Sequence, residues 1–191
     1  KPPTFERQIV TGNIDDIWHY LNIQMVFGNH LGYKGNVKKS LERGDEKMIK
    51  LVQRLDVLKQ RILQDTLLSA KSVVQYFNAK RLGDSIQIYD PTGTQVIETF
   101  TFPRQSEGLT LCLADFVAED RMDFIGMFVA TTGDGVSEIA KKLLNAGDYF
   151  DSHGLSAIAL ETAEAFAEYI HTQIRNEWGI PDAPGTPIED I

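Results

Sequence analysis

Residues 155–178 read LSAIALETAEAFAEYIHTQIRNEW, and this stretch decides the fold class because it is the longest segment with a helical period. Its apolar and small residues recur at three- and four-residue spacing, which places them on one face of an α-helix. They are Leu155, Ile158, Ala159, Thr162, Ala163, Phe166, Ala167, Ile170 and Ile174. Burying Phe166 alone contributes roughly 2–3 kcal/mol, so we expect this helix to pack against a core.

A polar line runs beside that face. Glu164, Glu168, His171 and Arg175 follow at i, i+4, i+7 and i+11. Residues at this spacing share one side of a helix. Taken without any family knowledge, such a line is typical of a solvated face.

Length and composition indicate one globular domain. The chain has 191 residues, of which 42% are apolar and 24% are charged. It contains no apolar run of about 18 residues, the length that a membrane helix needs, so no membrane partner is expected. We expect a single domain over residues 1–179 and a Pro-rich tail or truncated linker over residues 180–191.

Net charge and cysteine usage limit the expected binding partners and the expected cellular compartment. The net charge is −8, and the Lys and Arg residues are dispersed, which argues against binding to nucleic acid. Cys112 is the single cysteine and cannot form an internal disulfide. Because a secretory signal is also lacking at the front of the chain, the sequence favours the cytoplasm.

The first third of the chain is predicted to be helical after an extended start. Pro2 and Pro3 favour an extended segment over residues 1–12. Asn13 can cap a helix that we expect to run to about Phe27. Residues 37–47 resemble a polar connection, and helical spacing returns from Asp45 for about six turns.

The middle of the chain changes to the period of a sheet. We predict strands over residues 72–78, 85–89, 95–102, 109–113 and 123–131, from β-branched and aromatic residues and the turn signals between them. Short connections leave no room for helical crossovers, so the sheet should be largely antiparallel. With a short helix over residues 136–145 and helices at both ends, the predicted class is α+β.

Local motifs alone assign no chemistry. The sequence has no GxGxxG after a strand and no GxxxxGK[ST], so neither dinucleotide nor P-loop binding is indicated. The four histidines lack the spacing of a zinc site, and Cys112 lies in an apolar run typical of a core thiol. The residues by themselves indicate an α+β domain.

Five stretches of the chain form an ordered set of motifs. They are AKRLGDSIQIY (79–89), FPRQ (102–105), LCLADFVA (111–118), DFIGMFVATTG (123–133) and LETAEAFAEYIHTQIR (160–175). In sequence and order they resemble a known family, the activation domain of cobalamin-dependent methionine synthase, whose corresponding helix reads LAEAFAEYLHxxVR. The resemblance covers roughly residues 14–178 and implies a bent, largely antiparallel central sheet flanked by long N- and C-terminal helices.

The resemblance implies a repair function in methionine synthesis. In the family, this domain binds S-adenosylmethionine and supports reductive methylation of cob(II)alamin to methylcobalamin. The implied partners are a cobalamin-binding domain, on the same or a separate chain, which mainly holds the cobalamin, and a flavodoxin-type electron donor. The chain would act as a domain of 5-methyltetrahydrofolate–homocysteine S-methyltransferase, without activity alone.

The resemblance also implies site residues. Glu164 takes the position of the glutamate in AEAFAEY that contacts the amino group of S-adenosylmethionine. Asn22, in Tyr20-Leu21-Asn22-Ile23, stands where larger members have the aspartate of YIDW, so a charge is lost there. Glu168 and His171 are further candidates, and a solvated face is the alternative for both.

One family motif is absent from these 191 residues. The RPAPGYPACP-like segment, whose arginine binds the carboxylate of S-adenosylmethionine, should follow residue 191. Truncation of a longer chain is the favoured explanation, because PDAPGTPIEDI resembles the connection that precedes the motif. The alternative is a docking or scaffold domain that binds the cobalamin domain without S-adenosylmethionine.

Overall fold

The computed structural model describes residues 1–183 and 186, which fall into two compact units. The sheet unit comprises Lys1–Ile9, Val73–Val129 and Gln173–Asp182. The helical unit comprises Val10–Ser72 and Ala130–Thr172. The single domain over residues 1–179 stays a prediction, and residues 184–185 and 187–191 of the expected tail lie outside the described residues.

The sheet has the strand order β1-β2-β3-β4, and β5 also pairs with β2. The strands are β1 (Gln8–Gly12), β2 (Ala70–Leu82), β3 (Ser85–Tyr89), β4 (Val96–Thr101) and β5 (Asp123–Thr131). β2 pairs antiparallel with β3, and β3 pairs antiparallel with β4. Side chains alternate between buried and more exposed along most of β2, as the period of two predicts. The predicted α+β class is confirmed.

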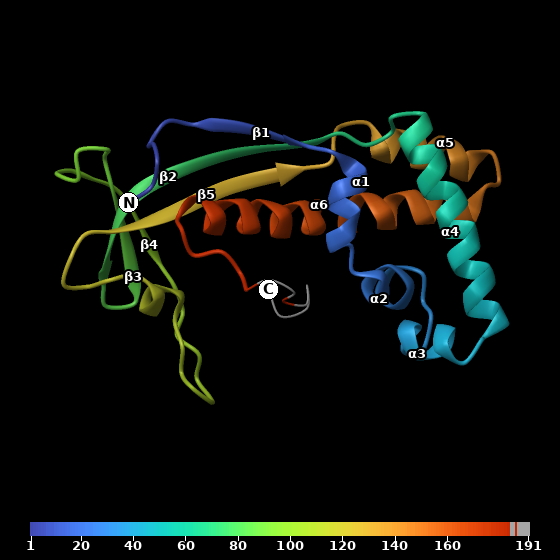
Figure 1. The fold of residues 1–191 in the computed structure, drawn as a ribbon, viewed down its shortest axis with the longest axis horizontal. Coiled ribbons are helices and arrows are strands. Elements are labelled where there is room, and N and C mark those ends of the chain that lie inside the picture. The colour runs from blue at the N-terminus through green and yellow to red at the C-terminus, as the bar shows by residue number, and fades with distance from the viewer. Residues whose placement is uncertain (184–185, 187–191) are drawn as a thin grey trace. The chain divides into compact units, whose positions relative to one another are not determined.

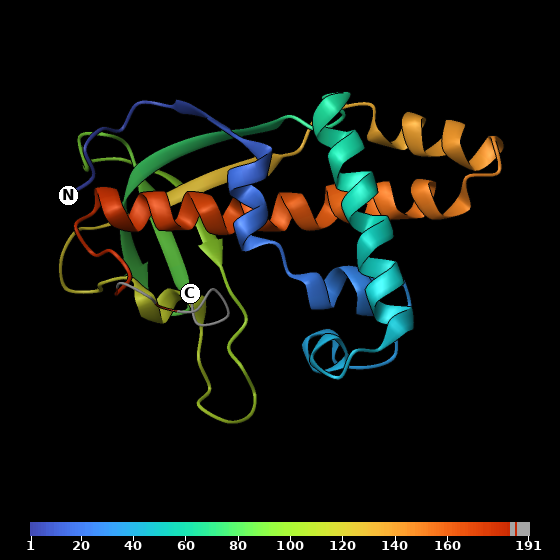
Figure 2. The same ribbon diagram turned by 45° about the vertical axis from the view of Figure 1, so that its right-hand side comes forward.

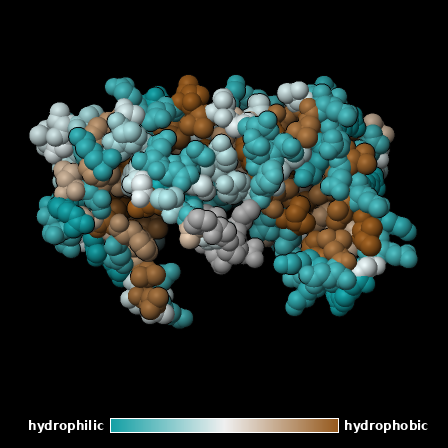
Figure 3. All heavy atoms as spheres, in the orientation of Figure 1, coloured by the Kyte–Doolittle hydropathy of each residue, from teal (hydrophilic) through white to brown (hydrophobic). Residues whose placement is uncertain are grey.

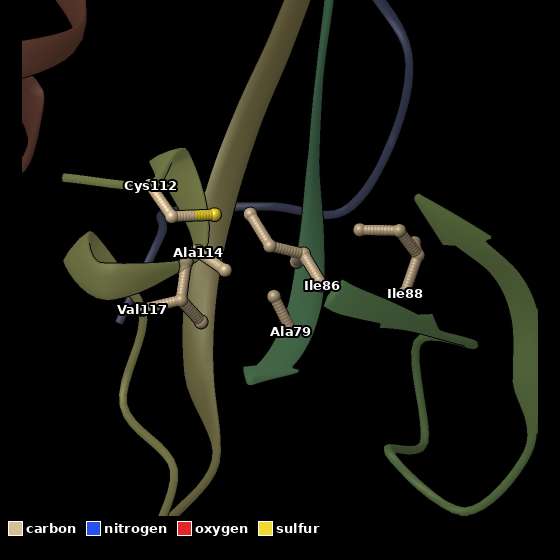
Figure 4. Packing of buried hydrophobic residues seen from close by; sticks show 6 residues of the cluster. All are labelled: Ala79, Ile86, Ile88, Cys112, Ala114 and Val117. Carbon is tan, nitrogen blue, oxygen red and sulfur yellow. The ribbon is translucent and has the colours of Figure 1, made fainter. Parts of the chain in front are cut away.

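A small apolar cluster forms the core of the sheet unit (Figure 4). It joins β2, β3 and the segment that precedes β5, through Ala79, Ile86, Ile88, Cys112, Ala114 and Val117. Cys112 is 2% exposed, which confirms the interpretation of a core thiol.

The predicted strand over residues 109–113 is wrong. Leu109 is 81% exposed and Thr110 has a φ of 52°, which a strand does not allow. A 3₁₀ turn, η3 (Leu113–Phe116), follows instead. Only Cys112 of this stretch is buried, so the other residues lack the packing that a buried strand would have.

Arg104 ties this loop to the rest of the sheet unit. Its guanidinium donates two hydrogen bonds to the Asp115 carboxylate, at 2.8 and 2.9 Å, and Nη2 donates to Asp84 Oδ1 at 2.6 Å. These bonds from Arg104, with one from the Cys112 backbone N–H, hold the pKa of Asp115 well below its usual range.

The helical unit contains most of the helices (Figure 1). They are α1 (Ile14–Ile17), η1 (Trp18–Tyr20), α2 (Ile23–Met25), η2 (Val26–His30), α3 (Val37–Glu42), α4 (Glu46–Gln64), α5 (Val136–Asn145) and α6 (Tyr149–Glu177), the last belonging to this unit as far as Thr172. Within the described residues, none of the helices combines the length and the apolar character that a membrane span requires.

The long predicted helix is confirmed, and its buried face is the predicted one. Leu155, Ile158, Thr162 and Phe166 are each 0% exposed. The helix begins at Tyr149, earlier than the periodic stretch that starts at Leu155. α4 lies across the first part of α6 in two views (Figures 1 and 2).

A glycine permits this close crossing. A β-carbon on Gly154 would lie 2.8 Å from Leu58 Cδ2. Arg54 and Arg61 of α4 also approach the Asp151 carboxylate, at 3.8 and 3.7 Å.

Two predictions for the first third of the chain need correction. The helix expected over residues 13–27 is broken after Tyr20, because Leu21 has extended backbone and Asn22 caps a new turn. The connection expected over residues 37–47 contains α3, which is capped by Asn36 and buries Val37 and Ser40. Asn13 caps α1 as predicted, and Asp45 caps α4.

Candidate functional site

A cavity of about 1150 Å³ opens within the helical unit. One wall is formed by residues 19–25 and His30, a second by residues 36–38 and Leu41, and the third by α6. Figure 3 shows hydrophobic residues on the surface around α2, and the exposed Leu41 and Leu160 are among the lining residues. A mostly apolar cavity with a few converging polar groups is the usual form of a small-molecule site.

The helix break after Tyr20 creates the first wall. Asn22 Oδ1 accepts a hydrogen bond from the Met25 backbone N–H at 3.1 Å, so its side chain starts α2. The next turn, η2, is a π-helical turn that ends at His30. Single π-turns are frequent at functional sites. An unbroken helix over these residues could not form this wall.

A buried hydrogen bond anchors the same wall to α6. Trp18 Nε1 donates to Thr162 Oγ1 at 2.9 Å, and Thr162 Oγ1 donates to the Ile158 carbonyl at 2.6 Å. The Lys59 ammonium lies 4.4 Å from the centre of the Trp18 ring. Trp18 immediately precedes the lining residues, so this contact helps to fix where the wall begins.

Three carboxylates of α6 line the cavity. Glu161, Glu164 and Glu168 follow at i, i+3 and i+7 and therefore share one side of the helix. Glu164 is exposed at the cavity, whereas Glu161 is only 5% exposed. Their negative charge suits a cationic ligand.

The structure brings three of the four predicted site residues to this cavity. Asn22, Glu164 and Glu168 line it. The described lining residues do not include His171, whose Nδ1 lies 3.7 Å from Glu168 Oε2.

A histidine and a glutamate that the sequence analysis did not select also line the cavity. His30 Nε2 and Glu161 Oε1 are 2.8 Å apart, and His153 Nε2 donates to the His30 carbonyl at 2.7 Å. A signal for Glu161 was present in the sequence, since it lies one helical turn before Glu164. No local signal pointed to His30, because 131 positions separate it from Glu161.

The remaining charged groups at the cavity come from the other two walls. His19 lies on η1, where its Nδ1 is 3.1 Å from the Asp16 carbonyl, and Lys38 lies on α3. In the part of the chain that the structure describes, no group of three or more His, Cys, Asp or Glu side chains is placed to hold a metal ion.

Comparison with known proteins agrees with this geometry. The family described as vitamin B12 dependent methionine synthase, activation domain, matches residues 13–190. The chain belongs to this activation-domain family. The membership accounts for the ordered motifs between residues 79 and 175, and it confirms the resemblance on which the site prediction rests.

Two individual relatives support the membership. The chain is 30% identical to the methionine synthase of Mycobacterium tuberculosis over 194 aligned positions, which cover 92% of this chain and 16% of that protein. It also matches a crystal structure of the MetH reactivation domain bound to AdoHcy, with 29% identity and a TM-score of 0.80. That match covers 91% of this chain and 56% of the other, so the chain spans only part of each relative.

Proposed function

We propose that this activation domain binds S-adenosylmethionine in the cavity between α6 and the wall formed by residues 19–25 and His30. The observation that carries the proposal is the acidic side of α6, where Glu164 opens onto a cavity of about 1150 Å³. The similar MetH reactivation domain has AdoHcy bound. The ligand would support reductive methylation of cob(II)alamin to methylcobalamin.

The cavity residues fit this ligand chemically. S-adenosylmethionine carries an ammonium and a sulfonium, and the carboxylates of Glu161, Glu164 and Glu168 attract both. Glu164 accepts a hydrogen bond from the ammonium and so orients the amino-acid end. The apolar lining excludes water from the rest of the ligand. When bound, the ligand supplies a methyl group for transfer.

Asn22 contributes to the site differently from an aspartate. Its Oδ1 accepts from the Met25 N–H and keeps a second lone pair, so the amide can still accept a hydrogen bond from the ligand but brings no negative charge. Glu168 adds negative charge at the cavity, and His171 acts on the ligand only through its contact with Glu168.

The larger reaction requires partners. We propose that a cobalamin-binding domain of methionine synthase docks on this chain and holds the cobalamin, and that a flavodoxin-type donor supplies the electron. The chain then takes part in the methyltransferase as one of its domains and has no activity alone. The family membership and the methionine synthase relative support this assignment.

Isothermal titration of S-adenosylmethionine into the wild-type chain and into Glu164→Gln tests the proposal. Loss of a hydrogen bond to a charged group weakens binding by about 1.5–3 kcal/mol, or roughly 10- to 150-fold. Glu138→Gln on α5 is the matched control, because it removes the same charge from an exposed residue that does not line the cavity.

Each outcome decides between stated alternatives. Selective weakening by Glu164→Gln supports the site. Equal affinity of Glu164→Gln and wild type excludes Glu164 as the ammonium partner. Failure to bind S-adenosylmethionine by both this chain and one extended through the expected downstream motif contradicts the proposed function and favours a docking domain without this ligand.

A further inference from the structure

His30 is held at the cavity by two side chains of α6. Its ring Nε2 lies 2.8 Å from Glu161 Oε1, and its backbone carbonyl accepts a hydrogen bond from His153 Nε2 at 2.7 Å. Both His30 and Glu161 line the cavity. The end of η2 is therefore attached to α6 through both the ring and the main chain of His30.

The buried carboxylate determines what the ring can offer. Glu161 is 5% exposed, and an ionised carboxylate only accepts hydrogen bonds, so His30 Nε2 is the donor. In the neutral imidazole the other nitrogen then carries a lone pair. Within the described residues Nδ1 has no hydrogen-bond partner, which leaves one acceptor on a side chain that lines the cavity.

The residue that is bonded to His30 lies close to the proposed ammonium partner. Glu161 and Glu164 are one helical turn apart, about 5–6 Å between their β-carbons. His30 is bonded to the first, and the second is the proposed ammonium partner. An ammonium has three N–H donors, so a single carboxylate does not satisfy it.

Asn22 alone is a weak partner for an ammonium. Its Oδ1 already accepts one hydrogen bond from the Met25 N–H and carries no charge, and its NH₂ group only donates. We propose that His30, oriented by the buried Glu161, is a specificity-determining residue whose Nδ1 accepts a hydrogen bond from the α-ammonium of S-adenosylmethionine. This inference rests on the proposed function and assigns a new contact within it.

Two ligands distinguish this contact from a structural role. S-adenosylmethionine and its analogue with a 2-oxo group in place of the amino group are titrated into wild type and His30→Ala, with circular dichroism to verify folding. His30→Ala is expected to weaken S-adenosylmethionine about tenfold, the loss of one hydrogen bond to a charged group, and to weaken the 2-oxo analogue less than about twofold.

Glu161→Gln provides a second test without loss of volume. The amide can either accept from Nε2–H or donate to Nε2, so the ring proton is no longer held on Nε2 and Nδ1 is no longer fixed as the acceptor. Its expected effect is again selective for the ligand with an ammonium. Glu138→Gln on α5 is the matched charge control, because it removes a carboxylate that neither lines the cavity nor contacts His30.

Three results overturn the inference. Equal weakening of both ligands by His30→Ala makes His30 a structural residue and leaves the proposed function intact. Unchanged affinity for S-adenosylmethionine in both His30→Ala and Glu161→Gln also rejects it. Absence of S-adenosylmethionine binding, both by wild type and by a chain extended through the expected downstream motif, rejects the proposed function together with the inference.

Discussion

Thr162→Val should destabilise the chain because it breaks the buried bond between the cavity wall and α6. Thr162 is 0% exposed and Trp18 is 8% exposed, so water cannot replace the lost partner. Leaving the indole N–H unsatisfied costs about 1–3 kcal/mol. The added methyl group regains up to about 0.8 kcal/mol by its burial.

The expected net loss is therefore about 1–2 kcal/mol of unfolding free energy. For a chain of this size it corresponds to a fall in Tm of about 2–8 °C. Urea denaturation followed by far-ultraviolet circular dichroism measures the free energy without relying on tryptophan fluorescence.

A double-mutant cycle with Trp18→Phe tests the cause. Phenylalanine has no N–H, so in its background Thr162→Val leaves no unsatisfied donor and should cost about 1 kcal/mol less than in wild type. If Thr162→Val costs the same in both backgrounds, the hydrogen bond does not stabilise this contact and the reasoning is refuted.

Three further predictions concern packing, charge and ligand affinity. Gly12→Ala should cost about 1–3 kcal/mol in urea denaturation, because the new β-carbon would lie 2.8 Å from Phe166 Cε2; a neutral result would show that the site can relax. Arg104 lowers the pKa of Asp115, so their interaction stabilises the folded chain above pH 4 and is lost as the pH falls through the lowered pKa. Asp115→Asn should therefore reduce the change of unfolding free energy between about pH 4 and pH 2, and an unchanged pH profile would exclude this contribution. Asn22→Asp keeps the helix cap and adds a carboxylate, so titration should show S-adenosylmethionine binding about three- to tenfold more tightly, whereas equal affinity would place this side chain away from the ammonium.

Where local period and burial agree, the sequence predicts the elements well. α4, β4, β5 and α5 lie close to their predicted bounds, and the apolar face of α6 is buried around Phe166. In α4 and α5 the residues that repeat at the helical period are buried, Leu55, Leu58 and Leu143 among them, whereas β4 is exposed along its length and is held by its pairing with β3. The local signal and the tertiary structure therefore give the same answer.

The failures have specific physical causes. The apolar spacing of residues 13–27 continues through the break, but Asn22 can cap a second turn, and only packing decides that it does so. Residues 37–42 are polar, yet burial of Val37 and a hydrogen bond from Tyr33 Oη to Ser40 stabilise α3. Propensity alone is too weak to predict either outcome.

The same distinction between local signals and tertiary packing applies to the candidate site. The sequence by itself determined the α+β class, the acidic side of α6 and, through the family's motifs, the candidate Glu164, because all three depend on residues within a few helical turns or on ordered matches along the chain. Only the tertiary structure decided that the Asn22 Oδ1 accepts the hydrogen bond of a helix cap. It also decided that His30 contacts Glu161, which is 131 positions away in the sequence. A contact at that separation depends on how the helices pack, and no local spacing encodes it.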